Sequence, residues 1–335
     1  MGPNRQTNEP WSMTLRTGST GPAVKDLRDR LRRAGFDPGP DDADCFTAGT
    51  EAAVWAFQED RGLRPDGLVG PQTWAALAEA GYALGDRLLY NTTPMLRGDD
   101  VADLQLRLGK LGFNAGRVDG IFGPNTQRAL EDFQHNAGLT TDGICGPETV
   151  ATLDRLRGRN HGKSSVAGVS EKEALRERAR LLLEMRLAVG HAGDLHSLAG
   201  SLAGGLEHGG ATVALLSHRD WSRQAALAND FEADAYLGLT LSESPSCEVV
   251  YFATSGFESV GGRHLAEMVV AELPSTPASG RKSTRGMRLP VLRETRAPAV
   301  VVDLGPPLAV VERSSLIVAA IQRAVTAWAE QPVQA

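Results

Sequence analysis

An internal repeat constrains this chain more than any other feature of its sequence. The segment Leu27–Phe36 (LRDRLRRAGF) returns as Leu104–Phe113 (LQLRLGKLGF), and Ala56–Trp74 returns as Asp132–Val150. The offset is 77 residues for the first pair and 76 for the second, so one residue was gained or lost between the copies. Such self-similarity is typical of one supersecondary unit used twice. We therefore expect two copies of one small fold in the first half of the chain.

Each copy is predicted to be a compact unit of three helices and roughly 65 residues, near the lower limit for independent stability. Its first helix has apolar residues at helical spacing and ends at a glycine suited to positive φ, Gly35 or Gly112. A second helix carries a conspicuous Phe, and an Asp-Gly turn then leads to a third helix that starts near a proline. The residues in these roles are Val24, Leu27, Leu31, Val54, Phe57, Asp66, Gly67 and Pro71, then Val101, Leu104, Leu108, Leu130, Phe133, Asp142, Gly143 and Pro147.

The second copy resembles the peptidoglycan-binding domain of the three-helix type. The matching residues are Asp119-Gly120, Phe122-Gly123, Thr126, Ala129-Leu130, Phe133-Gln134, Gly138-Leu139, Asp142-Gly143, Gly146 and Thr149. The first copy departs at Asp44-Cys45-Phe46, where it lacks the Asp-Gly turn and the Gly after the Phe. The resemblance implies binding of peptidoglycan or its muropeptide fragments. Since most motif residues are expected to be core and turns, the ligand-contact residues within 15–156 stay unknown.

The second half of the chain changes to alternating strands and helices. Strands are expected at Arg186–Val189, Thr212–Leu216, Ala235–Leu241, Glu248–Ala253 and Pro298–Leu304. Helices are expected at Glu173–Glu184, Leu195–Glu207, Trp221–Phe231, Gly262–Leu273 and Leu308–Ala329, with a basic loop before the last strand. Apolar strands that alternate with amphipathic helices indicate an α/β layer around a mostly buried sheet.

The predicted architecture is multidomain. A disordered tail (1–14) precedes two small all-α three-helix modules, at 15–84 and 90–156. A linker rich in polar residues, Gly and Ser (157–172) then leads to the α/β domain at 173–331.

This α/β half resembles the zinc-dependent N-acetylmuramoyl-L-alanine amidase domain in order and spacing. The residues in register with that family are Arg223, Ala228-Asn229, Ala233-Asp234, Leu292-Arg293, Thr295, Pro298 and Gly305. The resemblance implies a Zn²⁺ ion held by two His and one Glu, which activates water and polarises the amide carbonyl. A separate Glu would move protons.

The family's chemical positions are mostly replaced here. Aligned through its Gly-His pair, His191 stands at the family's first ligand His. Aligned from the next helix, it stands at the ligand Glu instead. One residue cannot fill both positions, so one ligand is missing in either alignment. Thr240 stands at the second His, and a neutral hydroxyl is a poor Zn²⁺ ligand. Asp303 stands at the catalytic Glu but is one methylene shorter. We therefore expect one imidazole, one hydroxyl and a shortened acid.

Three interpretations of His191 stay open: a residual pocket histidine, a lone structural histidine, or a true zinc ligand. Another histidine could in principle complete the site, and His196, His208 and His218 are the nearest in sequence. We expect each of these three to be a solvated or hydrogen-bonded side chain.

Composition restricts the partners. The net charge of −6 and pI of about 5.7 argue against a nucleic-acid partner, and basic residues cluster only locally, around 155–163 and 281–288. Solvated loops are the expected reading of these clusters, with a docking patch for an anionic partner as the alternative. The start lacks the apolar core of a signal peptide, no run could span a membrane, and the three separated cysteines suit a reducing compartment. We expect a cytoplasmic protein.

The combination of two such repeats and a disrupted zinc site resembles cytoplasmic actinobacterial amidase-like proteins of the CwlM type. That resemblance implies regulation of peptidoglycan precursor synthesis, through contact with a precursor-synthesis enzyme or transporter and under Ser/Thr kinase control. The C-terminal tail AWAEQPVQA has no Ser or Thr, and the nearest hydroxyl is Thr326 in the predicted last helix.

Two functional hypotheses follow. In the first, the chain is a non-catalytic regulator that binds peptidoglycan fragments or a partner enzyme and needs no cofactor. In the second, it is an active zinc amidase that uses His191 and Asp303 to cleave the bond between N-acetylmuramic acid and L-alanine. A third possibility is a scaffold that binds no sugar.

Overall fold

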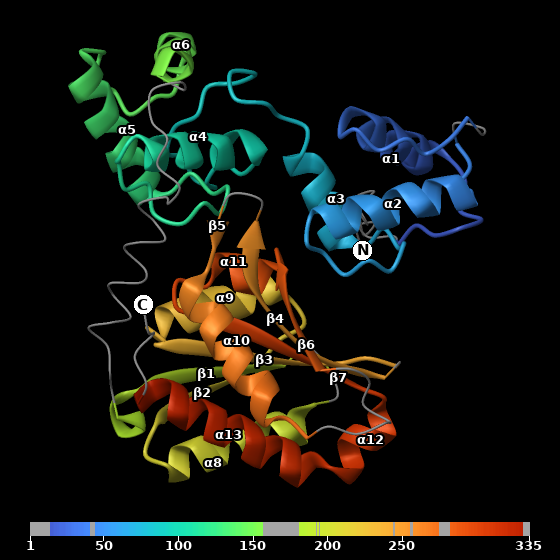
Figure 1. The fold of residues 1–335 in the computed structure, drawn as a ribbon. Coiled ribbons are helices and arrows are strands. Elements are labelled where there is room, and N and C mark those ends of the chain that lie inside the picture. Colours follow the sequence, from blue (N-terminus) through green and yellow to red (C-terminus); the bar gives the residue numbers. More distant parts are fainter. Residues whose placement is uncertain are drawn as a thin grey trace, which may run out of the picture. The chain divides into compact units, whose positions relative to one another are not determined.

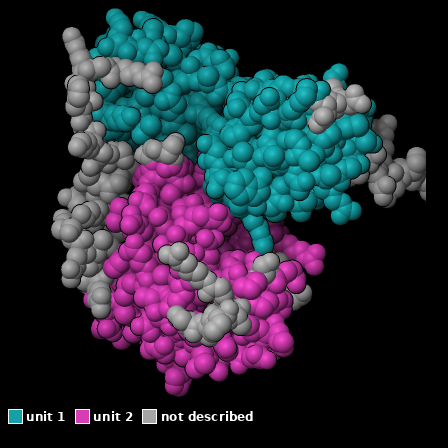
Figure 2. Space-filling model, turned by 45° about the vertical axis from the view of Figure 1, so that its right-hand side comes forward, with its two compact units in different colours: residues 1–162 teal, residues 163–335 magenta. Residues whose placement is uncertain are grey.

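The computed structural model describes residues 14–40, 44–156, 181–191, 193, 195–243, 245–254, 257–274 and 282–330 (Figure 1). The chain divides into two compact units, residues 1–162 and 163–335, which Figure 2 colours separately. The expected tail and linker lie outside the described residues, apart from Thr14. Among the helices that are described, none is long and apolar enough to cross a membrane.

The first unit contains two similar sets of three helices, as the repeat predicts. They are α1 (Pro22–Arg33), α2 (Ala48–Asp60) and α3 (Pro71–Glu79), then α4 (Asp99–Lys110), α5 (Pro124–Ala137) and α6 (Pro147–Leu156). Gly35 and Gly112 follow the first helix of each set with φ of 89° and 97°, which confirms the predicted left-handed ends. Pro71 and Pro147 begin the third helices, where a missing N–H costs nothing.

Each copy has its own apolar core. In the first, Phe57 lies edge-on to Phe36 with ring centroids 5.5 Å apart; in the second, Phe133 lies edge-on to Phe113 at 5.7 Å. The predicted apolar residues of the first two helices in each copy are buried around these pairs, together with Leu77 and Leu153 of the third helices. The copies are therefore two small domains of the same design.

One hydrogen-bond arrangement occurs three times in this unit. Gln134 in α5 donates to Asp142 Oδ1 (2.9 Å) and the Ile144 carbonyl (3.0 Å), and accepts the Gly143 N–H (2.9 Å). Gln58 ties the turn at Asp66–Leu68 in the same way, and Gln105 the turn at Asp119–Ile121. Each glutamine is buried, so it satisfies the polar groups of a turn that packs against its helix. The Asp-Gly motif of the family is thus structural.

The first copy replaces one of these glutamines by an arginine. Arg28 occupies the position that corresponds to Gln105, is 0% exposed, and donates to Thr50 Oγ1 (2.6 Å) and the Gly39 carbonyl (2.9 Å). Arg28 also donates to the Cys45 carbonyl (3.4 Å), in the segment that lacks the Asp-Gly pair. An arginine side chain is longer than that of glutamine, and its guanidinium only donates hydrogen bonds. It can therefore bind backbone carbonyls in a segment that has no Asp-Gly pair.

Burial also affects the thiol pKa, and hence the reactivity, of two cysteines in this chain. Burial raises the pKa of the Cys145 thiol to about 12, and also raises the pKa of Cys247. At pH 8 only about one Cys145 thiol in ten thousand is then ionised, and the thiolate is the reactive form. We predict that iodoacetamide modifies the half-buried Cys45 well before Cys145 in the folded chain. Peptide mass spectrometry checks this, with all three cysteines reacting in denaturant; equal labelling of Cys45 and Cys145 without denaturant would contradict it.

The second unit is an α/β sandwich built on one sheet. The described strands run in the order β2-β1-β3-β7-β4-β5, with β6 also paired to β4. They are β1 (Arg186–His191), β2 (Thr212–Ser217), β3 (Ala235–Leu241), β4 (Ser246–Thr254), β5 (Phe257–Glu258), β6 (Lys282–Met287) and β7 (Ala299–Gly305). Strands β2, β1, β3 and β7 are parallel, and β4 is antiparallel to β7.

Helices cover both faces of this sheet, as expected for buried parallel strands. The larger core lies on the face covered by α8 (His196–His208), α10 (Val260–Glu272) and α13 (Ser314–Glu330). The other face carries α9 (Trp221–Asp230) and α11 (Pro290–Glu294). Figure 1 shows α8 and α13 below the sheet and α9 and α11 above it.

Three expectations for this unit need correction. The expected basic loop contains β6 and α11, which the sequence pattern did not indicate because β6 is polar along most of its length. The expected last helix is two helices, α12 (Pro307–Glu312) and α13, separated at Arg313. Of the expected helix at 173–184, the described part contains a 3₁₀ turn at Leu182–Glu184, and residues 173–180 lie outside the described residues.

Candidate functional site

The three residues predicted from the amidase resemblance lie near the carboxyl ends of adjacent parallel strands. His191 ends β1, Thr240 is next to last in β3, and Asp303 is near the end of β7. This edge of an open α/β sheet is where ligands usually bind. The three residues therefore lie at one edge of the sheet.

The strand register nevertheless divides these residues between the two faces. His191 pairs with Leu239, and Leu239 with Val302, whereas Thr240 pairs directly with Asp303. Paired residues in parallel strands point the same way and successive residues alternate, so His191 lies on the α8 face and the other two on the opposite face. Strands β1 and β7 are also two spacings apart, roughly 10 Å. One metal centre made from His191, Thr240 and Asp303 is therefore not assembled.

His191 is a buried side chain with a second imidazole beside it. It is 2% exposed, and its Nδ1 lies 3.0 Å from the Gly193 carbonyl. Because a carbonyl only accepts, Nδ1 carries the hydrogen and Nε2 is left as an acceptor. That Nε2 lies 3.3 Å from Nδ1 of His196, the exposed first residue of α8. The expectation of a single imidazole was therefore wrong: two are in contact.

Asp303 is held by hydroxyl groups. Its Oδ2 accepts hydrogen bonds from Ser242 (2.9 Å) and Ser246 (2.6 Å). Its Oδ1 is buried and accepts no hydrogen bond from the described residues. Within those ranges, no group of three His, Cys, Asp or Glu side chains could hold a metal ion. His191 and Thr240, at two of the family's zinc-ligand positions, lie on opposite faces of the sheet, and Thr240 offers only a hydroxyl, so these residues do not fit the three-ligand ion of the zinc amidases.

A buried polar network supports the end of β1 from the α9 face. Gln224 in α9 donates to the carbonyls of His191 (3.0 Å) and His218 (2.5 Å), and Tyr236 donates to Gln224 Oε1 (2.6 Å). Both Gln224 and Tyr236 are 0% exposed, and burial raises the pKa of the tyrosine. Sequence reasoning missed this network; its one signal was a Gln and a Tyr at positions where the pattern requires apolar residues.

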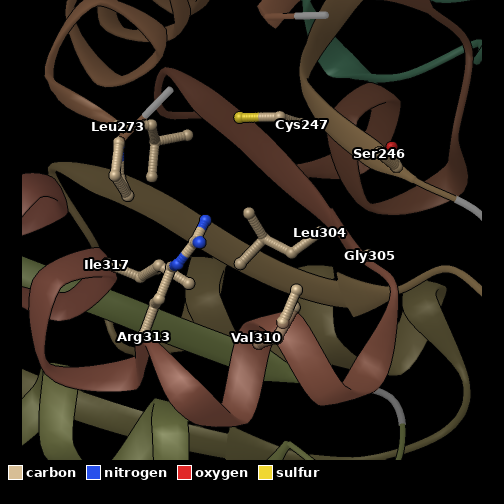
Figure 3. Close-up of a pocket in the computed structure, with 10 residues that line it drawn as sticks. Ser246, Cys247, Leu273, Leu304, Gly305, Val310, Arg313 and Ile317 are labelled. Atoms are coloured by element: carbon tan, nitrogen blue, oxygen red, sulfur yellow. The ribbon is translucent and has the colours of Figure 1, made fainter. Parts of the chain in front are cut away.

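A small cavity lies where β7 ends and β4 begins, on the face of the sheet covered by α13 (Figure 3). It is about 20 Å³, enough for a single water molecule. Its lining is largely apolar, with Cys247, Leu304 and Ile317 among it, and the Arg313 side chain reaches into it. The cavity is far too small for a muropeptide.

The remaining candidates are dispersed. His208 is exposed at the end of α8, and His218 accepts the Asp220 N–H at 3.0 Å. Thr326 is half-buried in α13, where its hydroxyl donates to the Gln322 carbonyl (2.9 Å).

Comparison with known proteins finds a family match for the two helical repeats. Residues 20–77 and 97–153 each match the family described as "Putative peptidoglycan binding domain". Among solved structures, the N-acetylmuramyl-L-alanine amidase Ami1 of Mycobacterium smegmatis aligns with 44% of this chain and 98% of its own, at 14% identity and a TM-score of 0.38.

Curated relatives match over longer stretches. The N-acetylmuramoyl-L-alanine amidase CwlL of Bacillus licheniformis is 33% identical over 172 residues, which cover 45% of this chain and 48% of that protein. The N-acetylmuramoyl-L-alanine amidase CwlM of Mycobacterium tuberculosis is 36% identical over 331 residues, which cover 87% of this chain and 81% of that protein. The chain therefore belongs to the CwlM family, with two peptidoglycan-binding repeats in front of an amidase-like α/β domain.

Proposed function

We propose that this chain is a cytoplasmic, non-catalytic regulator of peptidoglycan synthesis that binds peptidoglycan fragments or precursors. The observation that carries the proposal is the division of the amidase positions between two faces of the sheet, with His191 on one and Thr240 and Asp303 on the other. An ion held at one face cannot polarise an amide positioned against a carboxylate on the other. Recognition is assigned to the two helical repeats, and a precursor-synthesis enzyme or transporter is the partner class.

Cleavage is the first measurement. Purified full-length chain with added Zn²⁺ is incubated with muropeptides that carry an intact muramic acid–L-alanine bond, and products are separated by chromatography. We expect no release above the rate of a protein-free blank, because no described triad can activate water. Zinc-dependent release that disappears in Asp303→Ala would overturn the proposal and establish the amidase instead.

Binding is the second measurement. The same muropeptide is titrated onto full-length chain and followed by backbone amide NMR. We expect saturable shifts confined to amides of residues 15–156. An absence of shifts at millimolar muropeptide would leave a sugar-independent scaffold as the function of the repeats.

A further inference from the structure

We propose that the cavity at Arg313 is a docking site for an apolar segment of a partner protein that carries one carboxylate. The cavity lies on the face of the sheet covered by α13, opposite to Thr240 and Asp303. The site uses neither the amidase positions nor the helical repeats, so it stands whether or not the chain cleaves or binds peptidoglycan.

Arg313 supplies a cation without a partner. It separates α12 from α13, and Figure 3 shows its side chain extending into the cavity between Ile317 and Leu304. Its Nη1 is buried and makes no hydrogen bond within the part of the chain that the structure describes. A guanidinium only donates hydrogen bonds and is always charged, so a ligand at Nη1 must be an acceptor, and an anionic acceptor binds most strongly.

The size and lining of the cavity restrict the anion. The cavity opens to solvent, and its enclosed part, about 20 Å³, holds one group of the size of a water molecule. Arg313 is the one charged residue among the described residues that line it. A single carboxylate oxygen fits such a space and such a donor. A phosphate carries more charge and more acceptor oxygens than one guanidinium in an apolar lining can satisfy.

Exposed apolar side chains border the cavity. Leu308 and Val311 in α12 are 70% and 71% exposed, and Leu316 in α13 is 58% exposed. Each of the three is next in sequence to a residue that lines the cavity. Exposed apolar side chains that gather on a protein surface mark contacts with other proteins. A partner segment with apolar residues of its own can cover these three while its carboxylate reaches Arg313.

The charges around this surface favour a protein over a lipid bilayer. Residues 306–317 contain one acid, the exposed Glu312, and one base, Arg313. Helices that lie on membranes are rich in Lys and Arg, which attract anionic lipids. A surface with one acid and one partly buried base lacks that attraction. It suits a single carboxylate among apolar side chains.

The test is a titration of the full-length chain with two synthetic peptides, followed by backbone amide NMR. The peptides are Ser-Leu-Glu-Leu-Leu-Ser and its counterpart with Gln in place of Glu, both acetylated and amidated so that the Glu is the only carboxylate. We expect saturable shifts at amides of residues 304–317 with the Glu peptide and about tenfold weaker binding of the Gln peptide, because a hydrogen bond to a charged acceptor is lost. Arg313→Met keeps the apolar length of the side chain, and circular dichroism verifies its fold. It is expected to bind the two peptides equally.

Two further variants separate the charge from the apolar surface. Arg323→Gln is the matched control, because Arg323 lies on the same helix, is exposed and pairs with Glu272 at 2.9 Å; its affinities are expected to stay unchanged. Val311→Ser is expected to weaken both peptides alike. Equal affinities of the two peptides for the wild-type chain, no saturable shifts at millimolar peptide, or an unchanged affinity in Arg313→Met or Val311→Ser would refute the docking site. Binding of free N-acetylglutamate as tight as that of the Glu peptide would also refute it, in favour of a site for a small acid.

Discussion

Replacing Gly190 by alanine is expected to destabilise the sheet of the second unit by about 3 kcal/mol or more. A Cβ at this position would lie 2.1 Å from Gln224 Oε1 and 2.2 Å from the Tyr236 hydroxyl. Neither side chain can move aside cheaply, because both are fully buried and hydrogen-bonded to each other, and Gln224 also holds two backbone carbonyls. Overpacking costs about 1–3 kcal/mol and an orphaned buried polar group about 1–3 kcal/mol more.

Hydrogen exchange of the full-length chain measures this effect locally. Amides of β1 and β3 are expected to exchange about 100-fold faster in Gly190→Ala, since each 1.4 kcal/mol is a factor of ten. Amides of α1 to α6 act as the internal reference and keep their rates. Gly200→Ala is the matched control: a Cβ there meets nothing within 4 Å, and removing a glycine from the interior of α8 stabilises it by up to about 1 kcal/mol. Wild-type exchange in β1 of Gly190→Ala would show that this network does not constrain the strand.

The same network explains why position 190 is a glycine, which the sequence alone does not reveal. The Gly-His pair is a local pattern, whereas the atoms that exclude a side chain at Gly190 come from residues 34 and 46 positions later. The helices of the repeats, in contrast, were predictable because their signals are local: apolar spacing, a glycine at the end and a proline at the start.

The candidate site was predictable only to the level of the strand ends. The amidase resemblance selects His191, Thr240 and Asp303, and the predicted strands place them at or just beyond strand ends, but neither fixes the register. A shift of one residue moves a side chain to the other face, and this register separates His191 from the other two. The contact with His196 depends likewise on the residue at which α8 begins, and helix boundaries are poorly determined by pattern.

Replacing Gln134 by leucine is the second change for which we expect a large loss of stability, about 2–4 kcal/mol in the second repeat. Leucine keeps the approximate size of the side chain but removes every hydrogen bond that the amide makes to the turn. The Gly143 N–H and the Ile144 carbonyl lose their partner, and the Asp142 carboxylate loses one. The Gly143 N–H is buried, so the loss of its partner costs about 1–3 kcal/mol, whereas Asp142 and Ile144 are exposed and the loss of their bonds adds about 1 kcal/mol.

The matched control lies on the same helix. Gln127 is half-buried in α5 and bonds only surface side chains in the described structure, at 3.0 Å to Asn91 and 2.8 Å to Glu131. Water replaces such partners, so Gln127→Leu is expected to cost no more than about 0.5 kcal/mol. Exchange of the Gly143 amide distinguishes the two variants, because it is protected only while the turn stays bonded to α5. Equal exchange in both would mean that the Asp142–Gly143 turn holds its shape without the glutamine, which would contradict a structural role for this hydrogen-bond arrangement.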